Sequence, residues 1–156
     1  MAIQSYLIKN GIGIKKNEAQ AIELCLESCS KGSKLGEGMK HLFGYKTEKN
    51  EKKAFEIFKQ GVEEDKEINK KETPYFIFFL ARCYDLGTGV EKDIKKTIEL
   101  YEIAIRYDLP SAIYNLATLY DCEIGVVQIE KDIQKSIKLY EKSASLGNSD
   151  AIFALG

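Results

Sequence analysis

The apolar positions of this chain recur with helical spacing, in pairs of segments joined by a glycine-containing turn. The first segment of the clearest pair has apolar residues at i, i+3, i+4 and i+7, namely Ile77, Leu80, Ala81 and Tyr84. The second segment, residues 94–107, has the same spacing. Apolar residues at these intervals form one face of a helix. The pattern therefore predicts two antiparallel helices, helix A and helix B, on either side of the turn.

This helical pair is repeated along the chain. Residues 74–85 match residues 110–121 at an offset of 36, with Pro, Ile, Leu, Ala, Tyr and Asp at equivalent places. The turn that begins at Gly87 has a counterpart at Gly11, and that turn has a further counterpart at Gly44. A period of about 20 to 50 residues is typical of repeat architectures. We expect repeats at residues 1–32, 33–73, 74–109 and 110–148, followed by the start of a further unit at 149–156.

Residues at the segment ends predict where the helices begin and end. Pro74 and Pro110 stand at the start of two A helices, where a missing N–H group costs no hydrogen bond. Gly87 follows an A helix and is expected to take the left-handed conformation that ends many helices. Asp93 precedes a B helix, where its carboxylate can accept a hydrogen bond from a free backbone N–H.

Composition narrows the class of protein. The 156 residues are 44% hydrophobic and 30% charged, and 23 basic residues face 24 acidic ones, for a net charge of −1. Without a basic excess we expect no nucleic-acid partner, and without a long apolar run we expect no membrane span. The first residues lack the features of a signal peptide. We therefore expect a cytoplasmic protein of one domain whose four cysteines are reduced: Cys25, Cys29, Cys83 and Cys122.

Residues that could carry chemistry have simpler explanations. The Gly-x-Gly motifs at Gly11 and Gly87 lack the strand and the third glycine of a dinucleotide fingerprint. Cys25 and Cys29 stand at i, i+4 on one helix but have no second pair of ligands for a metal. His41 is the only histidine, and no motif places a nucleophile beside it. We expect no enzymatic activity, no cofactor and no metal.

A longer motif brings these observations together. From Leu80 to Tyr101 the chain reads Leu-Ala-x-x-Tyr-x-x-Gly-x-Gly-Val-x-x-Asp-x-x-Lys-x-x-x-x-Tyr, which resembles the Sel1-like repeat, a relative of the tetratricopeptide repeat. The resemblance is strong over residues 74–151 and partial over 3–73. The second repeat departs from the pattern, because His41 replaces a tyrosine and the turn at 44–46 lacks its second glycine.

The resemblance implies an all-α fold, an α-solenoid of antiparallel helix hairpins in a right-handed superhelix. It also implies that the A helices line a concave face and that the protein is an adaptor or scaffold. A secreted branch of the family that binds penicillin has a regular cysteine pair in each repeat. This chain lacks those pairs, so we do not extend that activity to it.

The second face of the A helices is the candidate binding site. We predict that a protein or peptide partner contacts residues on this face in three successive A helices: Tyr75, Phe78, Phe79, Arg82, Asp85, Tyr114, Asn115, Thr118, Asp121 and Phe153. Aromatic side chains flanked by polar ones are typical of recognition sites. Phe78, Tyr114 and Phe153 are expected to form an aromatic ladder, and the alternative is that Phe78 and Tyr114 pack between adjacent A helices.

The two ends of the array offer an alternative function. Neither end has a polar capping repeat, which a solenoid needs to cover its core. We expect the chain to be part of a longer protein, or to self-associate through apolar residues such as Ala151, Ile152 and Leu155. The leading hypothesis remains a non-enzymatic module that binds a peptide or helix on the concave face.

Overall fold

The structure is a computed structural model that describes residues 1–64, 71–121 and 132–156. These residues form nine α-helices and one short 3-10 helix, and they contain no strand. The elements are α1 (Ala2–Asn10), α2 (Glu18–Ser30), α3 (Lys34–Phe43), α4 (Glu51–Glu64), α5 (Thr73–Leu86), α6 (Ile94–Ala104), η1 (Ile105–Tyr107), α7 (Pro110–Asp121), α8 (Ile133–Ser145) and α9 (Ser149–Leu155). The expectation of an all-α solenoid is confirmed. Cys122 lies outside the described residues.

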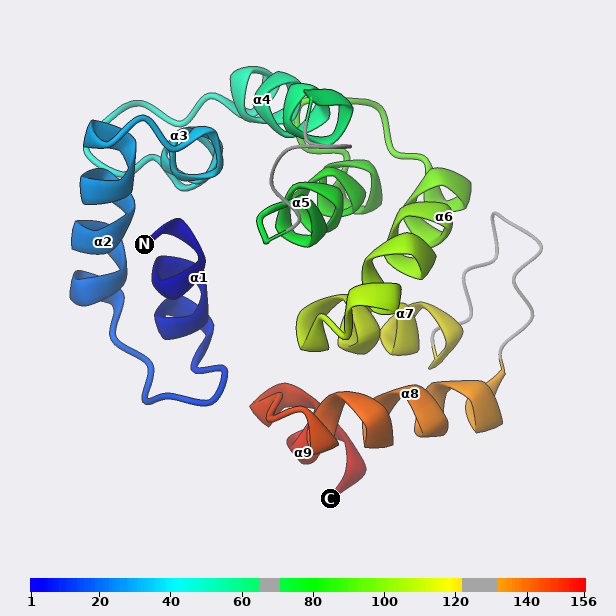
Figure 1. Ribbon diagram of the computed structural model, residues 1–156. Coiled ribbons are helices and arrows are strands. Elements are labelled where there is room, and N and C mark those ends of the chain that lie inside the picture. The colour runs from blue at the N-terminus through cyan, green and yellow to red at the C-terminus, as the bar shows by residue number, and fades with distance from the viewer. Residues whose placement is uncertain (65–70, 122–131) are drawn as a thin grey trace.

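The helices wind into a curved array (Figure 1). Helices α1, α5 and α7 lie toward the middle of the view, whereas α2, α4, α6 and α8 lie on the outside. The odd-numbered helices α1, α3, α5 and α7 are the A helices of the hairpins, and α9 begins a further one. Pro74 stands in the first turn of α5 and Pro110 is the first residue of α7, as the sequence predicted.

The turn after the A helix has the same backbone in three repeats. Helices α1, α3 and α5 end at Gly11, Gly44 and Gly87, whose φ angles are 69°, 71° and 70°. The residue two positions further on is also left-handed, with φ of 68° at Gly13, 50° at Lys46 and 73° at Gly89. The second repeat therefore keeps the common turn, with Lys46 in the place of the glycine that it lacks.

An Asn or Asp side chain caps each B helix. Asn17, Asn50, Asp93 and Asp132 each accept a hydrogen bond from the backbone N–H three residues on, at 3.1, 2.9, 3.0 and 2.9 Å. The backbone N–H of each cap also donates to a carbonyl of the preceding A helix, on Ile8, His41, Tyr84 and Tyr120. Each such cap contributes about 1 kcal/mol to helix stability. The same residue thus begins helix B and ties it to helix A.

Small residues allow the helices of the array to pack closely. A Cβ atom on Gly38 of α3 would overlap the ring of Phe58 on α4, and one on Gly61 of α4 would overlap the ring of Phe76 on α5. Each B helix also buries a small residue, at 0 or 1% exposure: Ala21, Ala54, Thr97 and Ser136. The core consequently runs from one repeat into the next.

Helix α1 contacts α5, which belongs to the third repeat. The ring centroid of Tyr6 lies 5.9 Å from that of Tyr75, 5.5 Å from Phe78 and 5.3 Å from Phe79, all in edge-on arrangements. Tyr6 is only 2% exposed. Burial raises the pKa of its phenol, and a hydrogen bond with the Ser111 side chain on α7 opposes this. The curvature of the array is therefore tight enough to bring the first A helix against the third.

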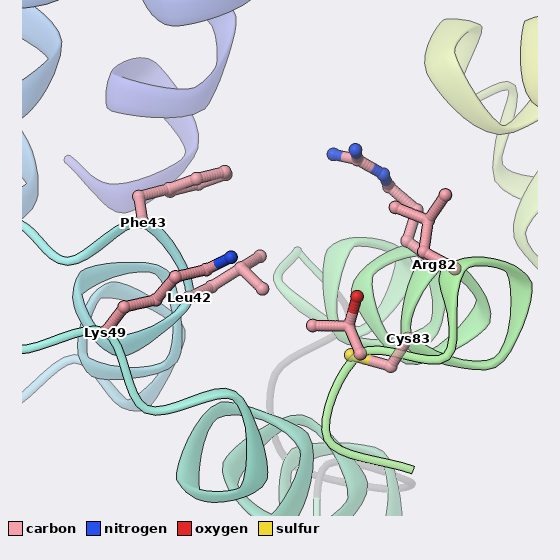
Figure 2. A pocket seen from close by; sticks show the side chains of 7 residues that line it. Leu42, Phe43, Lys49, Arg82 and Cys83 are labelled. Carbon is pink, nitrogen blue, oxygen red and sulfur yellow. The ribbon is translucent and has the colours of Figure 1, made fainter. Parts of the chain in front are cut away.

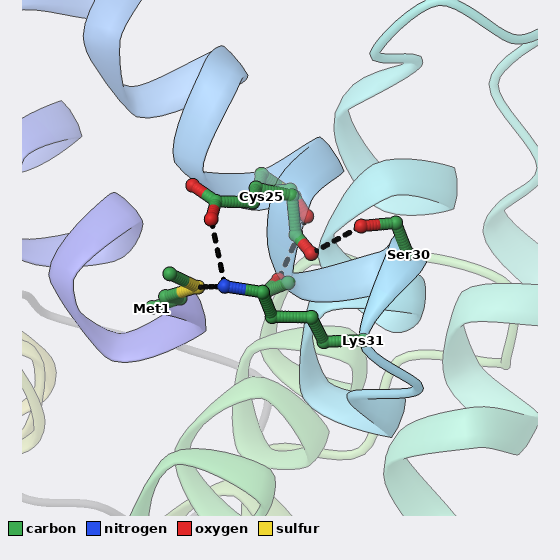
Figure 3. Close-up of polar contacts among 6 residues, drawn as sticks. Met1, Cys25, Ser30 and Lys31 are labelled. Carbon is green, nitrogen blue, oxygen red and sulfur yellow. Dashed lines mark hydrogen bonds and ion pairs between the residues drawn. The ribbon is translucent and has the colours of Figure 1, made fainter.

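The start of α1 is tied to the end of α2 (Figure 3). The ammonium group of Lys31, just after α2, donates to the Met1 sulfur at 3.4 Å and to the Glu27 carboxylate at 2.8 Å. Within α2, the Ser28 hydroxyl donates to the Cys25 carbonyl at 2.7 Å. These interactions tie the open end of the first hairpin, and the Tyr6 contacts hold the middle of α1 against α5.

The described residues, 1–64, 71–121 and 132–156, also bear on the question of a membrane span. None of the helices in that part of the chain is both long enough and apolar enough to cross a bilayer.

Candidate functional site

Phe78 and Phe79 of α5 lie in the core. They are 1% and 0% exposed, and the Phe79 ring also stacks on Phe58 at 4.9 Å between centroids. The prediction that these two side chains face an open groove is wrong. The physical reason is the curvature of the array, which places Tyr6 of α1 directly over them.

Tyr114 of α7 occupies the repeat position of Phe78 and has a different environment. The Phe78 ring lies 6.1 Å from Tyr101 of the following B helix, and the Tyr114 ring lies 5.6 Å from Tyr140 of its own following B helix. Both rings thus pack against the following B helix, whereas the alternative expectation placed them between adjacent A helices. However, Phe78 is also covered by Tyr6, whereas Tyr114 remains partly exposed. Burial raises the pKa of the Tyr114 phenol, with a smaller contribution from Asp150.

Two polar candidates on α7 are held by hydrogen bonds. The Asn115 amide donates to the Tyr101 hydroxyl at 3.0 Å, and the Thr118 hydroxyl donates to the Asn115 carbonyl at 2.7 Å. Both side chains stay partly exposed. The Asn115 side chain is thereby fixed in orientation, and its amide oxygen remains able to accept a hydrogen bond from a partner.

Arg82 and Asp85 lie near the end of α5, both partly exposed. The Arg82 guanidinium carbon is 6.0 Å from the centroid of the Phe78 ring. Burial raises the pKa of the Asp85 carboxyl, while Lys92 and Arg82 oppose this shift. Tyr75, one turn before Phe79, is half-buried against Tyr6, and burial raises the pKa of its phenol.

The remaining candidates lie at the surface. Asp121, the last residue of α7, is exposed, and Phe153 on α9 is 88% exposed. Phe78, Tyr114 and Phe153 are therefore buried, half-buried and exposed in turn. The predicted aromatic ladder along one groove is wrong, because α1 covers its first member.

A pocket that the sequence analysis did not predict opens beside Arg82 (Figure 2). It measures about 340 Å³. Phe43, Leu42 and Lys49 form one side, and Arg82 and Cys83 lie opposite them across the opening. Leu86 and Thr88 complete the lining. The pocket thus lies between the C-terminal ends of two successive A helices, α3 and α5.

The cysteines that the structure describes are packing residues. Cys25 and Cys83 are 0% and 2% exposed, and burial raises the pKa of each thiol to about 12. The Cys25 thiol donates to the Gly36 carbonyl at 3.4 Å. Such thiols are poor nucleophiles, because the thiolate is the reactive form. In the described part of the chain, no group of three or more His, Cys, Asp or Glu residues is arranged to hold a metal ion.

His41 is packed at the end of α3. It is 9% exposed, and its Nε2 lies 3.8 Å from the Glu37 carboxylate. Among the described residues, none forms a hydrogen bond with its buried Nδ1. Burial lowers the pKa of the imidazole, as do Lys53 and Lys40 to a smaller degree, whereas Glu37 opposes the shift. This arrangement predicts that the stability of the fold depends on pH.

We expect the protein to lose stability as pH falls below about 6.5, the ordinary pKa of histidine. Because the folded-state pKa of His41 is lowered, the unfolded chain binds more protons between that pKa and about 6.5. The contribution is fully present above this window and is lost as pH falls through it. Urea denaturation of wild type and His41→Gln at pH values of about 7.5 and 5.5 measures the effect. Equal pH dependence of the two proteins would contradict it.

Tyr6, Leu42 and Phe43 were not predicted from the sequence. Tyr6 has the repeat position of Arg82, at an offset of 76, and so lies on the inner face of its helix. A large aromatic residue at this inward-facing position was the sequence signal that α1 packs against another A helix. Leu42 has the repeat position of Asp85, by the 33-residue and 76-residue offsets. An apolar residue at a position that is polar elsewhere was the corresponding signal for the pocket.

A model of one protein family matches most of the chain. The Sel1 repeat model matches residues 1–33, 34–65, 74–106 and 110–148. Each matched segment contains one A helix and one B helix of the structure.

Solved structures share the fold. The chain is similar to the crystal structure of a Sel1 repeat protein from Oxalobacter formigenes, at 20% identity and a TM-score of 0.64, covering 99% of this chain and 60% of that one. It is also similar to a protective antigen of uropathogenic Escherichia coli with an SLR fold, at 24% identity, a TM-score of 0.67 and coverage of 99% and 32%. Cysteine-rich protein B of Helicobacter pylori matches at 21% identity, a TM-score of 0.58 and coverage of 88% and 93%. This chain therefore spans less than two thirds of the first two proteins.

Proposed function

This chain belongs to the Sel1 repeat family, and we propose that it is a non-enzymatic module that binds a peptide or helix of a partner protein on the inner side of α5 and α7. Sel1 repeat proteins are generally protein-interaction modules. The proposed site consists of the candidates that keep exposed surface on these two helices: Tyr75, Arg82, Asp85, Tyr114, Asn115, Thr118 and Asp121. We further propose that it acts in the cytoplasm.

The observation that carries this proposal is the contrast between Phe78 and Tyr114. They share a repeat position and pack in the same way on a tyrosine of the next B helix. The Tyr6 ring of α1 packs on Phe78 and covers it, whereas Tyr114 is left partly exposed. A partner that presents an apolar or aromatic side chain to Tyr114 would bury it as α1 buries Phe78. Aromatic residues of this kind often dominate binding energy.

We expect Tyr114→Ala and Arg82→Glu to remove partner binding while helicity persists. Neither side chain is fully buried, so the substitutions change the surface more than the core. Loss of a binding hot spot costs about 2 kcal/mol or more, equivalent to at least about thirty-fold in affinity. The measurement is affinity capture from the source lysate with wild type and the double variant side by side, followed by mass spectrometry. Circular dichroism checks that both are equally helical.

A matched control is Tyr107→Ala, because Tyr107 is an aromatic residue that is 50% exposed and belongs to η1 rather than to α5 or α7. It should capture the same protein as wild type. Retention of the partner by the Tyr114→Ala/Arg82→Glu variant would count against the proposed site.

Self-association is the second candidate function, and an observation at α9 favours it. Ile152, Phe153 and Leu155 are 56%, 88% and 42% exposed on this one short helix. An apolar surface of this kind is often an interaction site. If the capture experiment retains only further copies of the chain, that result favours self-association through α9 over partner binding on the inner side of α5 and α7.

A further inference from the structure

The pocket between α3 and α5 has apolar side chains that are still exposed to solvent and that a partner could cover. Phe43 and Leu42 are partly exposed, and Leu86 on the opposite helix is 61% exposed. Ligand pockets usually measure about 300 to 1,000 Å³, so this pocket of about 340 Å³ is near the lower limit. Its size suits one or two side chains of a larger partner better than a whole extended peptide.

Arg82 gives the pocket an unpaired positive charge. Among the described residues, no carboxylate forms an ion pair with its guanidinium, and no hydrogen bond to it is present. Lys49, on the opposite wall, is by contrast paired with Glu51 at 2.6 Å. The guanidinium group has five N–H donors in a planar fork that matches a carboxylate. Arg82 is therefore the cation of this pocket without an ion pair, although its ring contact with Phe78 remains and its charge opposes the raised pKa of Asp85.

Lys9 of α1 adds to the positive potential at the edge of the pocket. Its ammonium nitrogen lies 4.1 Å from the centroid of the Phe43 ring and 4.0 Å from the Glu18 carboxylate. Burial lowers the pKa of Lys9, Glu18 opposes this, and the charges of Lys16 and Arg82 lower it further. Two cations thus repel each other across this region, and an anion between them would relieve the repulsion.

Among the described residues, no backbone carbonyl at the ends of α3 and α5 accepts a hydrogen bond from the Arg82 guanidinium. One carbonyl in the last turn of each helix, that of Lys40 in α3 and that of Cys83 in α5, accepts a hydrogen bond from the capping N–H group of Gly44 or Gly87. The negative ends of the helix dipoles favour a positive side chain near them, but these carbonyls are already satisfied. The donors of Arg82 remain available to a ligand.

We infer that this pocket binds an acidic side chain, Asp or Glu, that stands next to a large apolar residue in the partner segment. The carboxylate pairs with the Arg82 guanidinium in a charge-assisted hydrogen bond, and the apolar neighbour packs between Phe43 and Leu86. This assignment rests on the proposed function, because it names the chemistry of the partner at one end of the same inner side. The carboxylate belongs to a side chain within the partner segment rather than to its C-terminus. The reason is that the proposed site continues beyond Arg82 to α7, so the segment extends past the pocket.

The test is a titration of isotope-labelled protein, followed by NMR, with two blocked dipeptides that differ in one group. Acetyl-Glu-Leu-amide should shift the backbone amide signals of Phe43, Cys83 and Thr88. Acetyl-Gln-Leu-amide has the same shape without the charge and should bind about ten-fold more weakly or less well still. Equal binding of the two, or no shift at these amides, overturns the assignment.

Matched arginine variants test the role of Arg82. Arg82→Gln should reduce the affinity for the Glu probe to that for the Gln probe. Arg106→Gln should leave it unchanged, because Arg106 is exposed on η1 and does not line the pocket. A probe with a free C-terminal carboxylate, acetyl-Gln-Leu, separates the two sources of a carboxylate. If this probe binds and the Glu probe does not, the assignment to an acidic side chain is overturned.

Tyr114→Ala distinguishes the failure of this inference from the failure of the proposed function. Tyr114 does not line the pocket, so its loss should leave binding of the Glu probe unchanged. If the probe fails to bind while partner capture still depends on Tyr114, only the assignment of the pocket is wrong. If the probe binds at the pocket but no captured protein depends on Tyr114, the proposed function fails.

Discussion

Tyr6→Ala is expected to lower the free energy of unfolding by about 3–5 kcal/mol, the usual cost of truncating a buried aromatic residue. The Tyr6 ring is 2% exposed and meets three other rings on α5 within 5.9 Å. Its loss leaves a cavity between the first and third repeats and removes the cover from Phe78. Urea denaturation followed by circular dichroism measures the change.

Tyr6→Phe is the matched control for this substitution. It keeps the ring contacts and removes the hydroxyl that interacts with Ser111, so we expect a loss of about 1 kcal/mol. A Tyr6→Ala variant that lost no more than Tyr6→Phe would contradict the role of the ring. In that case, the contact between α1 and α5 would contribute little to the folded state.

Gly89→Ala is expected to lower the free energy of unfolding by about 2–5 kcal/mol, as the sum of two costs. Gly89 has φ of 73°, and the left-handed conformation costs a residue with a Cβ about 1–2 kcal/mol. The added Cβ would also overlap the backbone of Glu51 and Lys52 at the start of α4. Backbone yields less readily than the end of a side chain, and such overpacking costs about 1–3 kcal/mol more.

Gly13→Ala separates the two costs. Gly13 has the same repeat position and φ of 68°, but no atom lies within 4 Å of where its Cβ would be. We expect this variant to lose only the conformational part, about 1–2 kcal/mol. If the two variants lost equal stability in chemical denaturation, the close approach between the third turn and α4 would not matter to the fold.

The features that local chemistry determines could be predicted from the sequence. Gly87 ends α5 in the left-handed conformation and Asp93 caps α6, as expected. These outcomes depend on a few neighbouring residues and on backbone groups that must be satisfied in any helix. The all-α hairpin repeat followed from the same kind of local pattern.

The burial of Phe78 and Phe79 could not be predicted from such local patterns. It depends on the curvature of the array, which accumulates from a small rotation at each repeat. The contact of Tyr6 with α5 joins residues more than 60 positions apart, and no turn or cap signal reports such a contact. For the same reason the pocket between α3 and α5 emerged only from the structure. Whether Tyr114, Asn115 and their neighbours bind a partner stays a prediction.

The contact between α1 and α5 also determines how the array responds to force. A solenoid in which each repeat touches only its neighbours can extend or change its pitch at little cost, as a spring does. Here, opening the curvature would pull the Tyr6 ring away from Phe78 and Phe79 and expose their apolar surface to water. The first three repeats are consequently stiff against extension. The part of the proposed site on α5 therefore keeps its position before a partner arrives, so little conformational entropy is lost there on binding.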